Sequence, residues 1–218
     1  MQTGTGLRRG ASGSGAKALC VLVHGRGQSP EDMESHILAR LRLQDVAIFL
    51  PRASRGAWYD ARAVDPLTEA TRNQLGNALA QLGAAVAALR REAPGAPLLL
   101  AGFSQGACLS IEYACLGSNP PDALVALTGC RVGTGQCVRP DAVPAGLPIY
   151  LTGSNADPWI PLEAMMAAAR SLGKCGARLR ADIFPDRAHE ASDAEIAMLQ
   201  SALNDLVNGR LPFMAAPR

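Results

Sequence analysis

The sequence predicts an α/β protein in which helices cover both faces of a mostly parallel, twisted sheet. Short apolar runs alternate along the chain with longer segments of helical spacing, an order that is typical of βαβ units. The runs are almost continuously apolar, as expected for strands buried on both faces of a parallel sheet. They lie at residues 17–23, 45–50, 97–101, 122–128, 148–153 and 178–184.

Length and composition fit one globular domain. The chain has 218 residues, of which 48% are hydrophobic, which is enough for one sizeable core. The formal net charge is +2 and the charges are scattered, so no basic face predicts nucleic-acid binding. We expect residues 1–16 to form a flexible leader that adds at most an edge strand. Residues 17–210 form the predicted single domain, and residues 211–218 a C-terminal tail.

The pattern of cysteines and the lengths of the apolar runs indicate in which cellular compartment the protein is expected. None of the six cysteines belongs to a C-x-x-C pair, so most are expected to be buried free thiols, with a Cys130–Cys137 disulfide as the alternative. No segment has the apolar core of a signal peptide, and no run approaches the length of a membrane span. The sequence therefore predicts a cytoplasmic protein. It leaves self-association open, a homodimer included.

Start and stop signals place helices between the strands. Ser29 is well placed to cap a helix that extends over about residues 30–43. A long amphipathic helix is expected over residues 66–92, with Asp65 as its candidate cap. The last helix is expected over residues 192–207, where Asn-Gly follows its final turn.

The apolar run at residues 97–101 passes into a helical segment through the sequence GFSQG at residues 102–106. A strand that enters a helix through G-x-S-x-G is a nucleophile elbow, a tight turn that exposes the serine hydroxyl. Gly102 and Gly106 lack a Cβ, which lets strand and helix pass close to Ser104. The turn holds the serine in a sparsely populated φ/ψ region. The motif in this context predicts Ser104 as a nucleophile; the alternative is a Gly/Ser-rich turn that binds nothing.

A serine nucleophile needs a general base, because its hydroxyl is almost wholly protonated at neutral pH. The chain has three histidines. His36 lies inside the predicted first helix among charged residues, which favours a solvated position. His24 follows the first strand and is suited to shaping the loop there, but it precedes Ser104 in the chain. His189, between the last strand and the last helix, is the remaining candidate base.

Such an imidazole is held in the correct tautomer by a buried carboxylate. Asp157 stands just past a strand end, between Ser104 and His189, and gives the chain order Ser, Asp, His. Asp186 is a rival because it is only three residues from His189. We favour Asp157, since a carboxylate on a separate strand can approach the ring without bending the histidine loop back on itself.

The tetrahedral intermediate of such a reaction needs two fixed N–H donors. One is the backbone N–H of Gln105, and the turn after the first strand can supply the N–H of Arg26. That Gly-rich turn also invites a dinucleotide-binding interpretation, which fails because Pro30 replaces the third glycine and no acid closes the next strand. No metal or organic cofactor is predicted.

With these residues assembled, the chain resembles the phospholipase/carboxylesterase family, a group of serine carboxylesterases that includes the acyl-protein thioesterases. The resemblance spans residues 17–207, and its matching pieces are LVHGRG at 22–27, GFSQG at 102–106, the segment 153–161 and the triplet AHE at 188–190. It implies an α/β-hydrolase fold that lacks a large cap domain. The implied triad is Ser104, Asp157 and His189, and the implied oxyanion hole is made by the N–H groups of Arg26 and Gln105.

The predicted reaction is the hydrolysis of a small carboxylic ester of short to medium acyl length through an acyl-enzyme. A thioester or a lysophospholipid ester is an alternative substrate, because the chemistry is the same and only the acyl groove differs. A non-catalytic binding protein is a third possibility. The candidates for an apolar substrate wall, among which the adjacent Trp and Tyr are equally suited to packing under a loop, are Trp58, Tyr59, Phe103, Trp159 and Ile160.

Overall fold

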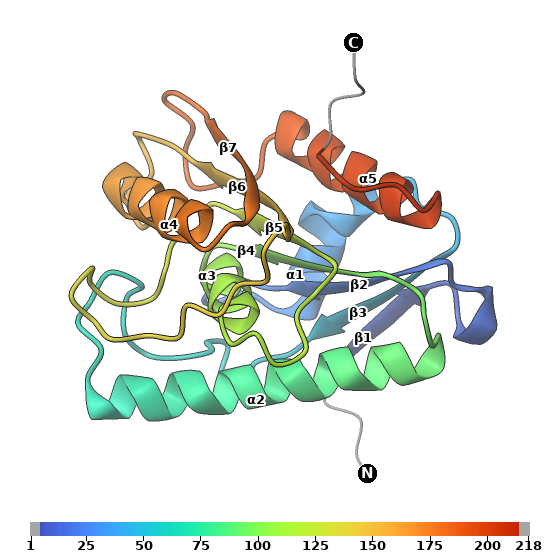
Figure 1. The fold of residues 1–218 in the computed structure, drawn as a ribbon, viewed down its shortest axis with the longest axis horizontal. Coiled ribbons are helices and arrows are strands. Elements are labelled where there is room, and N and C mark those ends of the chain that lie inside the picture. The colour runs from blue at the N-terminus through green and yellow to red at the C-terminus, as the bar shows by residue number, and fades with distance from the viewer. Residues whose placement is uncertain (1–4, 214–218) are drawn as a thin grey trace.

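The structure, a computed structural model that describes residues 5–213, has one sheet between two layers of helices (Figure 1). The sheet has seven strands in the order β1-β3-β2-β4-β5-β6-β7. Only β1 runs antiparallel to its neighbour, and every other pair of adjacent strands is parallel. The predicted α/β class with a mostly parallel sheet is confirmed.

The observed strands agree with the apolar runs to within one or two residues. They are β1 Gly6–Gly10, β2 Ala18–Val23, β3 Val46–Pro51, β4 Leu98–Phe103, β5 Ala123–Leu127, β6 Pro148–Gly153 and β7 Arg178–Ile183. The α-helices are α1 Pro30–His36, α2 Glu69–Glu92, α3 Gln105–Ala114, α4 Leu162–Lys174 and α5 Asp193–Val207, and two 3-10 turns span Gly13–Gly15 and Leu38–Arg40.

Two hydrophobic cores lie on the two faces of the sheet. In β4, Leu98 and Leu100 face the core that is shared with α2, α3 and α4, whereas Leu99 and Phe103 face the core that is shared with α1 and α5. In Figure 1, α2 runs along the lower side of the sheet and α5 along the upper side. Because both faces of the central strands are covered, their sequences are apolar without alternation.

The first helix is shorter than its sequence pattern predicts. It ends at His36 because Ile37 leaves helical geometry, at φ −119° and ψ −60°, and the chain continues as the 3-10 turn Leu38–Arg40. This change of path lets Leu38 and Leu41 pack against the same core as Ile37. The prediction of a helix to residue 43 was therefore wrong, although Ser29 caps it as expected.

The start of the long helix also differs from the prediction. Its cap is Thr68, whose hydroxyl accepts a hydrogen bond from the Thr71 N–H, so α2 begins at Glu69. Asp65 instead accepts hydrogen bonds from the backbone and guanidinium of Arg62. The prediction of Asp65 as the cap was wrong because a better-placed hydroxyl lies three residues nearer the apolar stripe.

The leader contributes the edge strand that its sequence allowed. Gly6–Gly10 pairs antiparallel with β3, and the Arg8 guanidinium lies 5.3 Å from the centre of the Phe49 ring. Residues 1–4 of the expected leader and residues 214–218 of the expected tail lie outside the described residues. Within residues 5–213, no helix is both long and apolar enough to span a membrane.

The turn from β4 into α3 brings the backbone of the helix very close to β2 and β4. A Cβ on Gly106 would lie 2.2 Å from the carbonyl oxygen of Val23, and one on Gly102 would lie 2.4 Å from the backbone of Gly106. These distances are well below van der Waals contact, so glycine is the residue that fits both positions. Ser104, between them, has φ 55° and ψ −121°, which is the strained conformation expected of the elbow.

We expect Gly106→Ala to lower the free energy of unfolding by at least about 1–3 kcal/mol, because the added methyl group must displace the backbone of β2. The matched control is Gly76→Ala in α2, where a Cβ would meet nothing within 4 Å. That change should stabilise the protein by roughly 0.5–1 kcal/mol, since alanine is the better helix former. Urea unfolding of both variants measures the difference, and equal effects would contradict the close crossing.

Candidate active site

The predicted functional residues lie at the carboxyl edge of the sheet, in loops that follow different strands. Ser104 follows β4, Asp157 lies between β6 and α4, and His189 lies between β7 and α5. Because these strands are parallel, the loops at their carboxyl ends meet at one edge. The fold thus brings together three residues that are far apart in the sequence.

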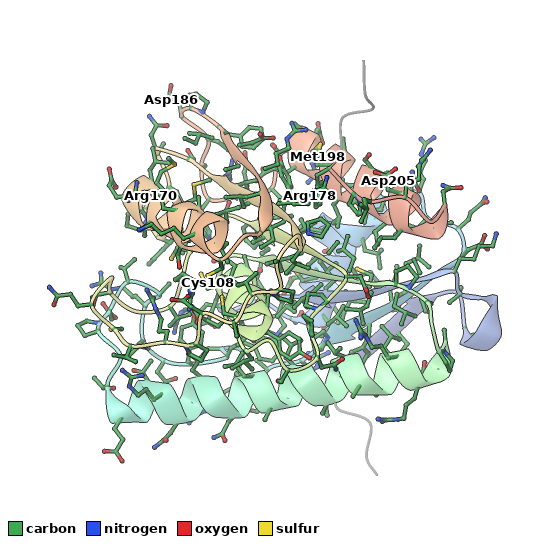
Figure 2. All side chains as sticks on the ribbon, viewed as in Figure 1. Cys108, Arg170, Arg178, Asp186, Met198 and Asp205 are labelled. Atoms are coloured by element: carbon green, nitrogen blue, oxygen red, sulfur yellow. The ribbon has the colours of Figure 1, made fainter. Side chains whose placement is uncertain are left out.

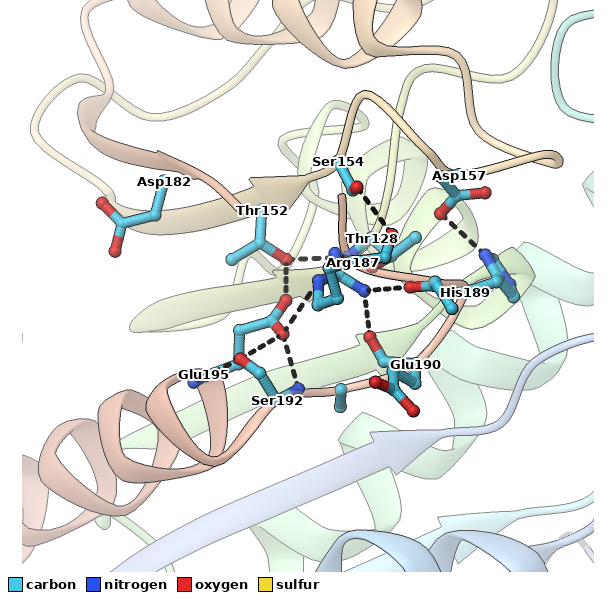
Figure 3. Close-up of polar contacts among 12 residues, drawn as sticks. Thr128, Thr152, Ser154, Asp157, Asp182, Arg187, His189, Glu190, Ser192 and Glu195 are labelled. Atoms are coloured by element: carbon cyan, nitrogen blue, oxygen red, sulfur yellow. Dashed lines mark hydrogen bonds and ion pairs between the residues drawn. The ribbon is translucent and has the colours of Figure 1, made fainter. Parts of the chain in front are cut away.

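Ser104, His189 and Asp157 form a continuous chain of hydrogen bonds. His189 Nε2 lies 2.8 Å from Ser104 Oγ, and His189 Nδ1 lies 2.7 Å from Asp157 Oδ2 (Figure 3 shows the second contact). With the Nδ1–H donated to the carboxylate, Nε2 is left to accept the serine proton. This geometry is that of a nucleophile, a base and the group that orients the base.

Asp157 is held ionised by its own loop. Its Oδ1 accepts the N–H groups of Trp159 at 2.8 Å and Ile160 at 2.9 Å, and its side chain is fully buried. Burial opposes the charged form, but the hydrogen bonds from His189, Ile160 and Trp159 outweigh it and lower the pKa of Asp157 below its usual value. The carboxylate can therefore stabilise a protonated imidazole at neutral pH.

Asp186, the rival carboxylate, lies elsewhere. It is exposed at the tip of the loop after β7, at the edge of the molecule in Figure 2, and its backbone N–H donates to Asn155. Its side chain accepts a hydrogen bond from the Asn155 amide rather than from His189. The carboxylate beside the imidazole is thus the one on the separate strand.

The backbone N–H groups of Arg26 and Gln105 belong to the two segments that meet at Ser104, the loop after β2 and the start of α3. A Cβ on Gly25 would lie 3.2 Å from the Ser104 Cβ, so the loop after β2 is pressed against the nucleophile. Among residues 5–213, neither the N–H of Arg26 nor that of Gln105 has a hydrogen-bond acceptor. Gln105 is also the first residue of α3, where the helix dipole favours negative charge. This pair can stabilise an oxyanion.

The loop that carries the Trp-Tyr pair anchors both of these residues. Arg26 Nη2 donates to the carbonyls of Tyr59, at 3.0 Å, and Ala61. The Gln105 side chain accepts the Trp58 N–H at 2.9 Å and donates to the Tyr59 carbonyl at 2.8 Å. The side chains of the two N–H donors are therefore tied to one segment, a connection that the sequence gives no signal for.

His24 supports the same loop as a neutral imidazole. It is fully buried, its Nδ1 lies 2.7 Å from the Gly25 carbonyl, and its Nε2 accepts the Ala53 N–H at 3.1 Å. The Trp58 ring packs 4.9 Å away, and its indole N–H donates to the His24 carbonyl. Burial lowers the pKa of His24, which keeps the ring uncharged. Sequence reasoning suggested that this residue shapes its loop, and the contacts explain how.

The five candidates for a substrate wall occupy three different surroundings. Tyr59, Trp159 and Ile160 line a cavity of about 240 Å³ that also contains Ser104 and His189. Phe103 lines a second cavity, of about 520 Å³, on the side of His189 that faces α1. Trp58 is 6% exposed and lines neither of these cavities. Its indole belongs to the packing under the loop, the alternative that the sequence left open.

The six cysteines are free, four of them buried. Cys108, in α3 near the centre of Figure 2, has its sulfur 4.0 Å from that of Cys130. Cys137 instead contacts the Thr134 hydroxyl at 3.3 Å, so the alternative of a Cys130–Cys137 disulfide is wrong. In the part of the chain that the structure describes, no group of three or more His, Cys, Asp or Glu side chains is arranged to hold a metal ion.

The buried neutral state of His24 predicts how stability depends on pH. In the unfolded chain this imidazole binds a proton as the pH falls through about 6.5, whereas burial disfavours protonation in the folded protein. The unfolded state then holds more protons, so the free energy of unfolding decreases as the pH falls from about 7 to about 5. His24→Gln removes this titration, and its unfolding free energy should decrease less over the same range. Identical slopes in denaturant titrations of both proteins would contradict the neutral assignment.

Comparisons with known proteins identify the family and the fold of this chain. The model of the Phospholipase/Carboxylesterase family matches residues 11–207. A phospholipase/carboxylesterase from Dyadobacter fermentans is similar in structure, with 28% identity, a TM-score of 0.81 and coverage of 94% of this chain and 99% of that one. None of the curated proteins matches the sequence.

Two further structures share the fold at lower identity. Esterase PE8 has 22% identity and a TM-score of 0.76 over 93% of this chain and 98% of its own. Acyl-protein thioesterase 2 of Zea mays has 18% identity and a TM-score of 0.69 over 94% and 99% of the two chains. The predicted α/β-hydrolase fold is confirmed, and residues 5–213 contain no cap domain. The chain belongs to the phospholipase/carboxylesterase family of serine hydrolases.

Proposed function

We propose that this protein is a serine carboxylesterase that hydrolyses esters of short to medium acyl length through an acyl-enzyme. The observation that carries the proposal is the hydrogen-bonded chain from Ser104 through His189 to Asp157, at 2.8 and 2.7 Å, beneath a strained elbow. Membership of a family of carboxylesterases and phospholipases supports the same reaction class. We expect the enzyme to act on small-molecule esters in the cytoplasm.

The mechanism follows from the roles that these positions allow. Ser104 Oγ attacks the ester carbonyl carbon while His189 Nε2 accepts its proton, and Asp157 stabilises the imidazolium. The N–H groups of Arg26 and Gln105 donate to the oxyanion of the tetrahedral intermediate. His189 then passes the proton to the leaving alcohol, which leaves the acyl-enzyme. A water molecule, deprotonated by the same imidazole, then attacks the acyl-enzyme, and the imidazolium returns the proton to Ser104 Oγ as the ester bond breaks and the acid leaves.

The cavity beside Ser104 supports a modest acyl group. Its volume of about 240 Å³ is small, and its apolar wall consists of Tyr59, Trp159 and Ile160. Trp159 is 62% exposed at the mouth, whereas Ile160 is 4% exposed. We assign these three residues to acyl binding, and Phe103, whose ring centre is 5.1 Å from that of His189, to the cavity on the other side of the base.

Ile160→Ala should shift the preference toward longer acyl groups, because it deepens this cavity while leaving the Ile160 N–H on Asp157. Each methylene that fits a pocket changes the free energy of the bound transition state by about 1–3 kcal/mol, which changes kcat/KM about 10–200-fold. The measurement is kcat/KM for a series of p-nitrophenyl esters of increasing acyl length. The matched control is Ile183→Ala, which removes an exposed side chain from β7. An unchanged optimum in Ile160→Ala would contradict the assignment of this cavity to the acyl group.

A panel of substrates separates the ester from its alternatives. A thioester or a lysophospholipid ester would use the same triad, so the leaving group and the acyl length have to be varied independently. A carboxylesterase should show its highest kcat/KM on simple alcohol esters. A higher value on acyl-cysteine peptides would favour a thioesterase, and one on lysophosphatidylcholine a lysophospholipase.

Ser104→Ala tests the nucleophile. It should reduce kcat on a chromogenic short-chain ester on the order of 10⁶-fold and abolish labelling by a fluorophosphonate, since no other group supplies the attacking oxygen. Ser201→Ala, an exposed position on α5, is the matched control and should keep both properties. A Ser104→Ala protein that retains wild-type hydrolysis would rule the mechanism out, and a wild-type protein that is never labelled would favour a non-catalytic binding protein.

A further inference from the structure

A buried arginine lies two residues before the proposed base. The Arg187 side chain is 6% exposed, in the loop between β7 and α5 (Figure 3). Its Nη1 donates to the carbonyl of Ala188 at 2.9 Å and to that of Glu190. These are the carbonyls of the residues on either side of His189. One guanidinium is therefore hydrogen-bonded to the backbone immediately before and after His189.

The same guanidinium fastens this loop to the centre of the sheet. Its Nη2 donates to the Thr128 hydroxyl at 2.9 Å, and Thr128 directly follows β5. Thr128 is itself fixed, because it has φ 57° and its N–H donates to the Thr152 hydroxyl at 2.8 Å. The histidine loop thus has a rigid attachment on a strand that carries neither Ser104 nor Asp157.

Glu195, in the first turn of α5, supplies the counter-charge. It is 0% exposed, and its Oε2 lies 3.6 Å from Arg187 Nε, within ion-pair range but too far for a hydrogen bond. The carboxylate accepts the Ser192 N–H at 2.7 Å and the Thr152 hydroxyl at 2.5 Å. Arg187, Glu195, Thr128, Thr152 and Ser192 form one buried polar network, which we call the Arg187 network.

A further contact joins this network to the loop that carries Asp157. The Ser154 hydroxyl donates to the Arg187 carbonyl at 2.6 Å and accepts the Ala156 N–H at 3.1 Å. The backbone carbonyl of Arg187 is therefore hydrogen-bonded to the loop that carries Asp157. Its side chain is hydrogen-bonded to the carbonyls on either side of His189. The separation between the imidazole and its carboxylate depends on both contacts.

Stability alone does not account for a buried ion pair at this place. Removing two charges from water is costly, and apolar residues of similar volume are often equally or more stabilising. A guanidinium, however, offers several N–H donors in a fixed planar fork, and here three hydrogen bonds from two of its nitrogens meet three different residues. That geometry suits the positioning of a loop.

We propose that Arg187, held by Glu195, is a positioning residue that fixes the His189 imidazole within reach of both Ser104 and Asp157. The inference rests on the proposed function, because it assigns His189 the role of base. Displacing a reacting group by about 1 Å can slow a reaction about 10²-fold. Arg187 touches neither substrate nor the reacting atoms, so it acts through the placement of the ring.

The first test compares Arg187→Met, Arg187→Lys and the control Arg180→Met, measured below the melting temperature of each protein. Arg180 is a half-exposed arginine on β7 that also pairs with a carboxylate, Asp182.

Arg187→Met should lower kcat about 10²-fold with KM unchanged, because only the base is displaced. Arg187→Lys, which keeps the charge but not the fork, should fall between Arg187→Met and wild type. Arg180→Met should match wild type. A folded Arg187→Met protein with wild-type kcat would overturn the positioning role.

A double variant keeps the test decisive if the single variant does not fold. Arg187→Met leaves the Glu195 carboxylate buried without its counter-charge, which is strongly destabilising. Arg187→Met/Glu195→Gln removes both charges and retains an amide that can bond Ser192 and Thr152. This protein should be folded and should show the same loss of kcat. Wild-type kcat in the folded double variant would overturn the proposal.

Proton NMR can report the position of the His189 imidazole in the absence of substrate. The N–H proton between His189 and Asp157 should give a strongly deshielded proton resonance in wild type and in Ser104→Ala. The resonance should broaden or disappear in the folded Arg187 variants and persist in Arg180→Met. An unchanged resonance in those variants would overturn the positioning role even if wild type hydrolyses no ester. A wild type without hydrolysis would refute the proposed function separately.

Discussion

The close crossing of α3 over β2 and β4 is the constraint on which the rest of the site depends. Two glycines allow it, since a Cβ at Gly106 would lie 2.2 Å from a carbonyl oxygen of β2. The crossing gives Ser104 its φ of 55° and puts the free N–H of Gln105 at the start of the helix. It also presses the loop after β2 against the serine. The proposed nucleophile and one of the two proposed oxyanion donors, the Gln105 N–H, are therefore products of one turn.

The remaining parts of the site are held by buried polar contacts from outside the turn. A neutral His24 and the loop at residues 57–61 contact the segments of the proposed oxyanion donors, and the Arg187 network contacts the loop of the proposed base. Both supports use side chains that never touch the serine. In each case the contacts attach a loop to a strand or a helix end. The sheet thus brings the loops of the candidate site together, and buried hydrogen bonds hold these loops in position.

The sequence predicted the parts of this arrangement that depend on local pattern. Continuous apolar runs marked the strands, and the chain order Ser, Asp, His selected the residues that the sheet brings together. The end of α1 was mispredicted because the chain turns at Ile37 into a 3-10 segment that packs on the core. The start of α2 was mispredicted because a second capping residue, Thr68, lies three residues after Asp65 and accepts the Thr71 N–H. Packing of Trp58 under its loop was one of two alternatives that the sequence left open, and the contacts of its indole decide between them. The contacts of Arg187 were not foreseen, since a buried guanidinium is recognised only from its neighbours across the fold.

The most direct test of the account is a crystal structure of the protein after reaction with an organophosphate. The account predicts phosphorus bonded to Ser104 Oγ and a phosphoryl oxygen about 2.7–3.1 Å from the backbone nitrogens of both Arg26 and Gln105. It also predicts the His189 ring still hydrogen-bonded to Asp157. Phosphorylation of another residue, or a phosphoryl oxygen that points away from both N–H groups, would contradict it.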